Sequence, residues 1–255
     1  MTDDVTTVAQ KALTLLDLTS LNDGDSEADV TELCKRAVSD FGHTAAVCVW
    51  PQFVPHAKKL LSGSGVAVAA VANFPAGATD VGRAVEETAA IVADGGDEVD
   101  VVMPYNAWLA GDRALARELI TACKAACGDS ALLKVILETG RLETAENISA
   151  ASLDAIEAGA DFIKTSTGKV EISATLPAAE AMLNAIKETG GTTGFKAAGG
   201  IRSTSDAADY LALSDKILGT GWAAPGNFRF GASGLLNDLL AVLRGDASAP
   251  SKESY

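Results

Sequence analysis

The stretch LLKVILETGRLETAENISAASLDAIEAGADFIKTS, residues 132–166, contains one complete strand–helix–strand pattern. Residues 132–138 are dominated by apolar side chains, and residues 161–166 place Phe162 and Ile163 ahead of a polar turn. Residues 144–158 between them are rich in Ala and also contain Leu and Glu, which favours a helix. Short apolar runs separated by a helix are typical of parallel strands that are covered on both faces.

The same alternation extends over the whole chain of 255 residues. It predicts eight strands, at residues 15–20, 45–50, 66–73, 98–104, 132–138, 161–166, 193–198 and 228–232. Helices are expected at residues 25–39, 79–94, 112–127, 144–158, 175–189 and 203–213. This rhythm predicts an α/β fold, a (β/α)8 TIM barrel with an extra N-terminal helix, and a doubly wound open sheet is the alternative. We expect a single domain over residues 1–255, with a polar and mobile tail at about 244–255.

The composition restricts the partners of the chain. With 20 basic and 34 acidic residues the formal net charge is −14, which disfavours nucleic acid and anionic membranes as partners. The apolar runs are shorter than the roughly 20 residues needed to span a bilayer, and the N-terminal MTDDVTTVAQ is acidic where a signal peptide would be basic. We therefore expect a cytoplasmic protein, and any phosphate-bearing ligand must bind at a local basic pocket.

Polar residues lie at or near the carboxyl ends of the predicted strands, where barrel enzymes have their active sites. They are Asp17, Thr19, Cys48, Asn73, Asp100, Lys134, Glu138, Lys164, Lys196 and Ser233. An unpaired ammonium group is costly to bury, so three lysines in one barrel mouth should lower the pKa of at least one. A neutral amine is a nucleophile toward carbonyl groups. The alternative is a purely structural ion network in which Asp100 and Glu138 pair with the lysines.

Two loops predict an anion site. KAAGGIRS (196–203) and FGASG (230–234) place glycines or Ser after a strand and before a helix, where backbone N–H groups and the helix dipole favour phosphate. The chain has only two histidines, His43 and His56, so we expect no metal site. Together the lysines and loops indicate a Schiff-base enzyme that acts on a small phosphorylated carbonyl compound.

Several motifs carry a family resemblance. They are GADFIKTSTGK (159–169), DEVDVVMPY (97–105), LLKVILETG (132–140), GFKAAGGIR (194–202), AAVCVWP (45–51), LDLTSLN (16–22) and FRFGAS (228–233). These motifs follow one another along the chain, between about residues 5 and 243, as they do in the deoxyribose-phosphate aldolase family, which the chain therefore resembles. The resemblance implies a class I aldolase, a carbon–carbon lyase that reversibly cleaves 2-deoxy-D-ribose 5-phosphate to D-glyceraldehyde 3-phosphate and acetaldehyde in deoxyribonucleoside catabolism. It implies a lysine Schiff base and no cofactor.

The resemblance also implies residue roles. Lys164 would be the Schiff-base lysine, Asp100 and Lys196 the proton-transfer pair, and Tyr255 a terminal Tyr that assists proton transfer at C2. Phosphate would be held by Thr167, Lys169, Gly199, Gly200, Ser233 and Gly234. Many relatives carry Ser where this chain has Gly234, which keeps the backbone donor but lacks the hydroxyl. We place Asp17, Thr19, Cys48 and Lys134 at the substrate site as well.

Alternatives remain open on the sequence alone. One is a class I aldolase that acts on ketose phosphates, and another is a catalytically silent protein that binds phosphosugars. Beside a basic cluster, the pKa of the Cys48 thiol is expected to be lowered, which would make it reactive toward unsaturated aldehydes. The sequence does not fix the oligomeric state, for which a homodimer is one option.

Overall fold

Eight parallel strands close into a barrel in the computed structural model, which describes residues 4–246. The strands are β1 (Leu16–Thr19), β4 (Ala46–Val49), β5 (Ala67–Ala72), β6 (Glu98–Val102), β7 (Leu132–Ile136), β8 (Phe162–Lys164), β9 (Gly194–Ala198) and β10 (Phe228–Ala232). Each strand pairs with the next along the chain, and β1 also pairs with β10, with Asp17 opposite Gly231. This last pairing closes the sheet, so the predicted (β/α)8 barrel is confirmed and the open sheet is excluded.

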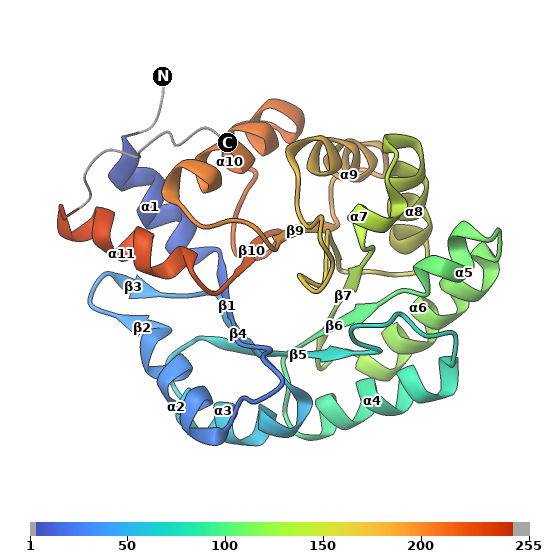
Figure 1. Cartoon of the computed structure of the whole chain (residues 1–255), viewed down its shortest axis with the longest axis horizontal. Helices are drawn as coiled ribbons and strands as arrows, with labels where there is room; N and C mark the ends of the chain where they lie inside the picture. Colours follow the sequence, from blue (N-terminus) through green and yellow to red (C-terminus); the bar gives the residue numbers. More distant parts are fainter. Residues whose placement is uncertain (1–3, 247–255) are drawn as a thin grey trace.

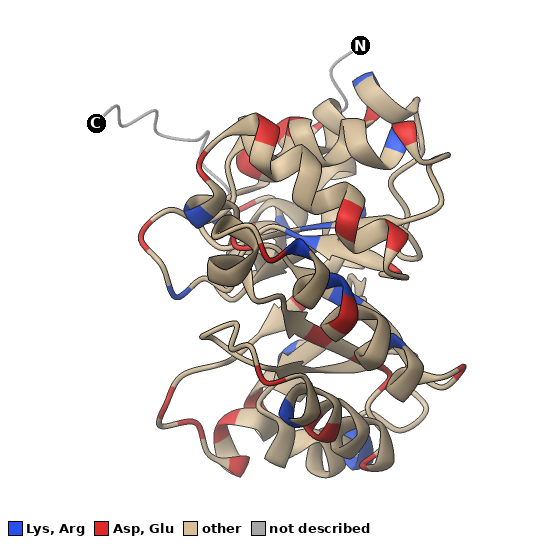
Figure 2. Cartoon of the chain, turned by 90° about the vertical axis from the view of Figure 1, so that its right-hand side faces the viewer, with Lys and Arg blue, Asp and Glu red and all other residues tan. Residues whose placement is uncertain are grey.

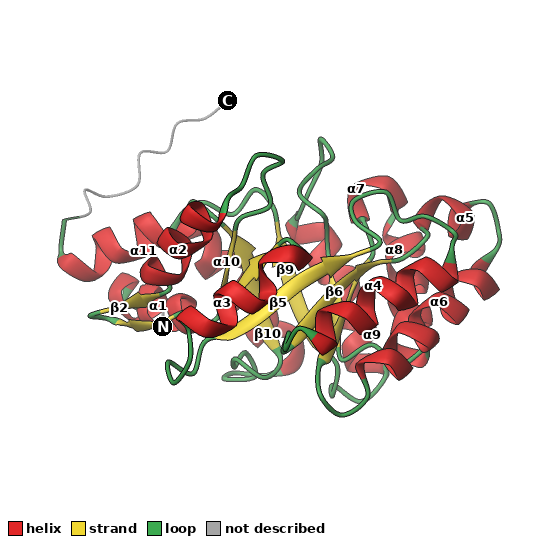
Figure 3. Cartoon of the chain, turned by 90° about the horizontal axis from the view of Figure 1, so that it is seen from below, coloured by secondary structure: helices red, strands yellow, loops and turns green. Residues whose placement is uncertain are grey.

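Helices surround the barrel (Figures 1 and 3). They are α1 (Val5–Thr14), α2 (Glu27–Arg36), α3 (Val54–Leu60), α4 (Val81–Ala93), α6 (Arg113–Cys127), α8 (Ala145–Glu157), α9 (Leu176–Glu188), α10 (Thr204–Leu218) and α11 (Leu235–Arg244). The predicted N-terminal helix is confirmed as α1, which packs against α10 and α11. Within residues 4–246, no helix has both the length and the apolar character that crossing a membrane requires.

Local side-chain chemistry explains where the longer helices begin. Ser26, Asp80, Asp112, Thr144, Thr175 and Ser203 each accept a hydrogen bond from a backbone N–H in the first turn of the helix that follows. Such N-caps satisfy donors that have no partner inside the helix, and each contributes about 1 kcal/mol. The six helices expected from the sequence therefore start within two residues of their predicted positions.

Several short elements differ from the expectation. The predicted helix at 25–39 ends at Arg36, and the chain continues into a two-stranded antiparallel sheet of β2 (Val38–Ser39) and β3 (Gly42–His43). Gly42 adopts a φ of 122°, which only glycine tolerates well, and this lets the chain reverse direction. The structure also adds the short helices η1 (Pro51–Phe53), α5 (Tyr105–Leu109) and α7 (Thr139–Leu142).

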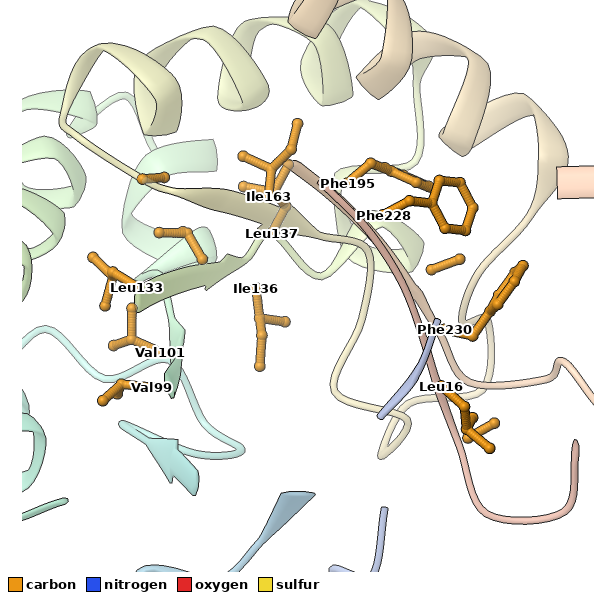
Figure 4. Close-up of a cluster of buried hydrophobic side chains, with 14 of the residues drawn as sticks. Leu16, Val99, Val101, Leu133, Ile136, Leu137, Ile163, Phe195, Phe228 and Phe230 are labelled. Carbon is orange, nitrogen blue, oxygen red and sulfur yellow. The ribbon is translucent and has the colours of Figure 1, made fainter. Parts of the chain in front are cut away.

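The main core lies between the strands and the surrounding helices. In Figure 4, Ile163, Phe195, Phe228 and Phe230 lie in this layer, and all four are fully buried. Because side chains alternate between the two faces of a strand, the neighbours of these residues point into the barrel. The inward positions on β6, β8 and β9 include Asp100, Lys164 and Lys196, so the core on the outside fixes the polar groups on the inside.

Candidate active site

Three lysines meet at one carboxylate inside the barrel. Lys164, at the end of β8, is 3% exposed, and its Nζ donates to Oδ2 of Asp100 at 2.7 Å. Nζ of Lys196 donates to the same oxygen at 2.8 Å, and Nζ of Lys134 donates to Oδ1 at 3.0 Å. Burial alone would raise the pKa of Asp100, but the three ammonium groups outweigh it and hold that pKa well below its usual range.

The lysines differ in how strongly they hold their protons. Burial and the nearby charge of Lys196 lower the pKa of Lys164, although Asp100 opposes this shift. Burial would lower the pKa of Lys196, but the negative charges of Asp100 and Asp17 outweigh burial and raise this pKa. Asp100 and Glu98 likewise outweigh burial at Lys134 and raise its pKa. Lys164 is therefore the amine of the three that most readily loses its proton.

Two charged residues that were absent from the predicted set complete this network. Glu98 of β6 accepts from Lys134 and from both terminal nitrogens of Arg229, which lies on β10. Arg229 also donates to Oδ1 of Asp17 at 2.6 Å. Glu98 is two residues before Asp100, so the two-residue period of a strand places both on the inner face. That period is the signal that would have found Glu98 from the sequence.

A cavity of about 440 Å³ opens above the network at the carboxyl ends of the strands. Its lining includes the predicted residues Thr19, Lys164, Thr167, Lys169, Gly199, Gly200, Ser233 and Gly234. The other predicted residues Asp17, Cys48, Asp100, Lys134 and Lys196 are fully buried and do not line the cavity. Lys164 thus connects the buried network to the open space. Tyr255 lies outside the described residues.

The loops after β9 and β10 form one wall of the cavity. Gly199 and Gly200 both have a φ of 85°, and a Cβ at Gly199 would press on the side chain of Ser173. These loops lead into α10 and α11, whose N-termini carry partial positive charge. Arg202 also lines the cavity and was not predicted, although it lies only two residues after Gly200. The wall has the donors and the charge that an anion requires.

The loop after β8 forms the adjacent part of the cavity wall. Nζ of Lys169 donates to the carbonyl oxygen of Leu21 at 2.7 Å, and the backbone N–H of Lys169 donates to Oγ1 of Thr167 at 3.0 Å. The Thr167 hydroxyl in turn donates to Oε2 of Glu138 at 2.5 Å. Glu138 therefore fixes this loop, and among residues 4–246 no lysine forms a salt bridge with it. In the alternative of a purely structural ion network, Asp100 and Glu138 would both pair with the lysines; in the described residues Asp100 alone does so.

The prediction that the pKa of the Cys48 thiol is lowered is wrong. Its thiol is fully buried, and burial together with the negative charge of Asp100 raises its pKa. The three lysines act in the opposite direction but do not outweigh these effects. The sequence suggested a basic surrounding, but the lysines are themselves paired with carboxylates, so little uncompensated positive charge is left to stabilise a thiolate.

Metal ligands do not gather in the described part of the chain. Among residues 4–246, no group of three His, Cys, Asp or Glu side chains is arranged to hold a metal ion. The two histidines contact other groups, His43 the carbonyl oxygen of Ser64 and His56 the hydroxyl of Thr31. The residues inside the barrel pair with one another, which suits proton transfer and amine chemistry.

A (β/α)8 barrel in which a lysine of lowered pKa opens to a cavity suits a Schiff-base enzyme, the class that the sequence also indicates. A profile of the DeoC/LacD family of aldolases matches residues 11–240, from β1 through β10. The chain belongs to the DeoC/LacD family of aldolases. The resemblance found in the sequence motifs is therefore confirmed at the level of the family.

Solved structures of similar proteins cover nearly the whole chain. A presumed deoxyribose-phosphate aldolase from Toxoplasma gondii is 26% identical, with a TM-score of 0.85 over 96% of this chain and 99% of that one. A presumed deoxyribose-phosphate aldolase from Coccidioides immitis is 30% identical, with a TM-score of 0.77 over 90% and 85%. The deoxyribose-phosphate aldolase of Aeropyrum pernix, described as a tetramer, is 25% identical with a TM-score of 0.76 over 95% and 98%.

Proposed function

We propose that this protein is a deoxyribose-phosphate aldolase, which cleaves 2-deoxy-D-ribose 5-phosphate to acetaldehyde and D-glyceraldehyde 3-phosphate. The observation that carries the proposal is the position of Lys164, an amine of lowered pKa that joins a buried proton network to a cavity with an anion-binding wall. The similar proteins from Aeropyrum pernix, Toxoplasma gondii and Coccidioides immitis support the choice of substrate.

The chemistry follows from this position. The Lys164 amine attacks C1 of the open-chain sugar, and loss of water gives a protonated imine. The C2–C3 bond then breaks: its electron pair moves into the imine to form an enamine, while the C3 hydroxyl loses its proton and becomes the aldehyde of D-glyceraldehyde 3-phosphate. Protonation of the enamine at C2 and hydrolysis of the imine release acetaldehyde. Asp100 and Lys196, which contact each other and lie next to Lys164, are placed to move these protons.

The surroundings of Lys164 favour a small donor aldehyde. Leu21, Cys48, Ala69 and Val71 form a buried apolar cluster that Trp50 and Phe74 border. Leu21 lines the cavity, and Cys48 is near enough to Lys164 to influence its pKa. A two-carbon enamine suits an apolar wall of this kind better than the phosphorylated three-carbon donor of a ketose-phosphate aldolase, which carries a second charged group.

Trapping of the imine tests the proposal. Borohydride added in the presence of acetaldehyde should deliver hydride to the imine and leave an N-ethyl group on Lys164, located by peptide mass spectrometry. Lys164→Met should lose both the adduct and the cleavage activity, whereas Lys58→Met, on the outer helix α3, should keep both. Wild-type protein that shows no adduct on Lys164 would contradict the mechanism. Preference for dihydroxyacetone phosphate over acetaldehyde as donor would favour the ketose-phosphate alternative.

A further inference from the structure

The charged side chains inside the barrel form a closed ring of alternating sign. In order around the ring they are Asp100, Lys196, Asp17, Arg229, Glu98 and Lys134, with Lys134 returning to Asp100. All six are at most 5% exposed. They come from strands as distant in sequence as β1 and β10, so the ring forms only when the barrel closes.

The first half of the ring contacts Lys164. Asp100 accepts from Lys196 at 2.8 Å through the same Oδ2 that accepts from Lys164 at 2.7 Å. Nζ of Lys196 also donates to Oδ2 of Asp17 at 2.5 Å, and Oδ1 of Asp17 accepts from Arg229 at 2.6 Å. Lys164 is thus attached to the ring at a single point, the carboxylate of Asp100.

The second half of the ring does not contact Lys164. The two terminal nitrogens of Arg229 donate to Glu98 at 2.8 and 3.2 Å, and Nε donates to the carbonyl oxygen of Pro225 at 2.7 Å. Glu98 also accepts from Lys134, which closes the ring. Arg229 and Glu98 therefore lie on the far side of the ring from the cavity.

The charge balance of the ring links Arg229 and Glu98 to the protonation state of Lys164. With every member ionised, the ring has three positive and three negative charges, so its net charge is zero. A neutral Lys164 amine leaves the buried group neutral, whereas a Lys164 ammonium adds one uncompensated charge. A net charge in a low-dielectric interior is costly, so the balanced ring favours the amine.

We propose that Arg229 and Glu98 are positioning residues for Lys164: through the ring they fix the charge balance and the geometry that keep its amine unprotonated and reactive. This inference rests on the proposed function, in which Lys164 forms the imine. It adds two residues that touch neither the substrate cavity nor Lys164.

Other charged or titratable groups also face Lys164. Asp100 of β6 and Lys196 of β9 act on it directly, Cys48 of β4 lies close by, and the carboxylate of Glu138 after β7 is near enough for its own pKa to respond to Lys164. Lys134 of β7 reaches it only through Asp100. Variants at Arg229 and Glu98 remove none of these side chains, so they alter the charge of the ring without deleting a group that faces Lys164.

The two single variants should act in opposite directions. Arg229→Gln removes one positive charge and leaves the ring with an excess negative charge. Binding of a proton by the most basic unprotonated group nearby offsets this charge. An amine is more basic than a carboxylate by about six pH units in water, so Lys164 takes that proton and its pKa rises. Glu98→Gln leaves excess positive charge, which disfavours the Lys164 ammonium further. The midpoint of the Lys164 titration, followed by the pH dependence of acetaldehyde trapping, should lie about one pH unit above that of wild type in Arg229→Gln. In Glu98→Gln it should lie about one pH unit below.

Two further variants separate charge from shape. In Arg229→Gln with Glu98→Gln, one charge of each sign is lost, so the midpoint should return to within about 0.3 pH units of wild type. Arg229→Lys keeps the positive charge but loses the bidentate hydrogen bonds to Glu98. Its titration midpoint should also stay near that of wild type. A purely structural role would lower activity in all four variants without opposite shifts.

The measurement is the rate of acetaldehyde trapping on Lys164 as a function of pH. Amine and aldehyde form the imine with loss of water, and cyanoborohydride supplies the hydride that makes the N-ethyl product, which mass spectrometry locates. Equal midpoints in wild type, Arg229→Gln and Glu98→Gln would overturn the inference, while no trapping in wild type would instead overturn the proposed function. If Arg229→Gln does not fold, Glu98→Gln and Arg229→Lys decide: the first must lower the midpoint and the second must leave it.

Discussion

Glu138 follows β7 with a φ of 58°, a left-handed conformation that costs a residue with a side chain about 1 kcal/mol. Its carboxylate is fully buried, and burial raises its pKa even though Thr167 donates to it. A strained backbone and a buried acid at one position persist only where the surroundings hold them in place. Here they are held by the loop of Thr167 and Lys169, which forms one wall of the cavity.

Removal of the Glu138 carboxylate should therefore weaken binding of the phosphorylated sugar. In Glu138→Ala and Glu138→Gly, the loop loses its anchor, and we expect KM for 2-deoxy-D-ribose 5-phosphate to rise about tenfold, equivalent to one lost charged hydrogen bond. KM for 2-deoxy-D-ribose, which has no phosphate, should change little. Steady-state kinetics with both sugars measures this contrast.

The Gly variant serves as the control for backbone strain. Gly accepts a φ of 58° freely and Ala does not, so Glu138→Gly should be the more stable of the two while both show the same rise in KM. A rise in KM only in Glu138→Ala would mean that backbone geometry, and not the carboxylate, holds the loop.

At the scale of the element, β8 and β9 approach closely where Gly194 lies opposite Phe162. A Cβ at Gly194 would collide with the Phe162 ring, which also lies 5.7 Å from the guanidinium carbon of Arg229. Gly194→Ala should thus lower the free energy of unfolding by about 1–3 kcal/mol, the usual effect of an overpacked core. Gly226→Ala is the matched control, because nothing lies within 4 Å of its added Cβ.

Urea unfolding followed by circular dichroism compares the two glycine variants. Gly226→Ala should stay within about 1 kcal/mol of wild type, since it changes only the flexibility of an exposed turn. Equal stability of Gly194→Ala and Gly226→Ala would show that β8 and β9 can separate without cost. In that case Phe162 would not be a fixed support for Arg229.

The sequence predicts the long elements well and the short ones poorly, for a physical reason. A strand such as β7 or a helix such as α6 has enough residues to show a period, whereas α7 and the pair β2–β3 have between two and four residues each. Among the site residues, the predicted Lys164, Asp100 and Lys196 do come together. The contact of Asp17 with Arg229 joins residues 212 apart, so it follows only from closure of the barrel.

The whole molecule separates a balanced interior from an acidic exterior. The ring inside the barrel has no net charge, so the excess of acidic residues that gives the chain its formal charge of −14 lies elsewhere, and Figure 2 shows acidic positions along the outer helices and loops. Like charges on a folded surface repel one another, and salt screens them over a distance of about 10 Å at 0.1 M ionic strength. The buried ring is screened far less.

Salt should consequently stabilise the protein at neutral pH. Raising sodium chloride from 0.05 to 0.5 M should increase the free energy of unfolding on the order of 1 kcal/mol and raise Tm by about 2–4 °C in calorimetry. Chloride is preferable to sulfate, which resembles phosphate and would compete for the anion-binding wall of the cavity. The increase should be smaller at pH 5, closer to the isoelectric point of about 4.5, where the surface repulsion has largely disappeared.

Tm values at pH 5 and pH 7 can be compared because the buried carboxylates of Asp17 and Asp100 stay ionised at both. The pKa values of Asp17 and Asp100 are lowered in the folded protein, so their contribution to stability is fully present above the unfolded value of about 3.9 and is lost only as the pH falls toward the folded values. Between pH 5 and 7 both carboxylates therefore remain ionised. A Tm that falls with salt at pH 7 would show that surface ion pairs, and not repulsion among the acidic residues, dominate the electrostatics of this barrel.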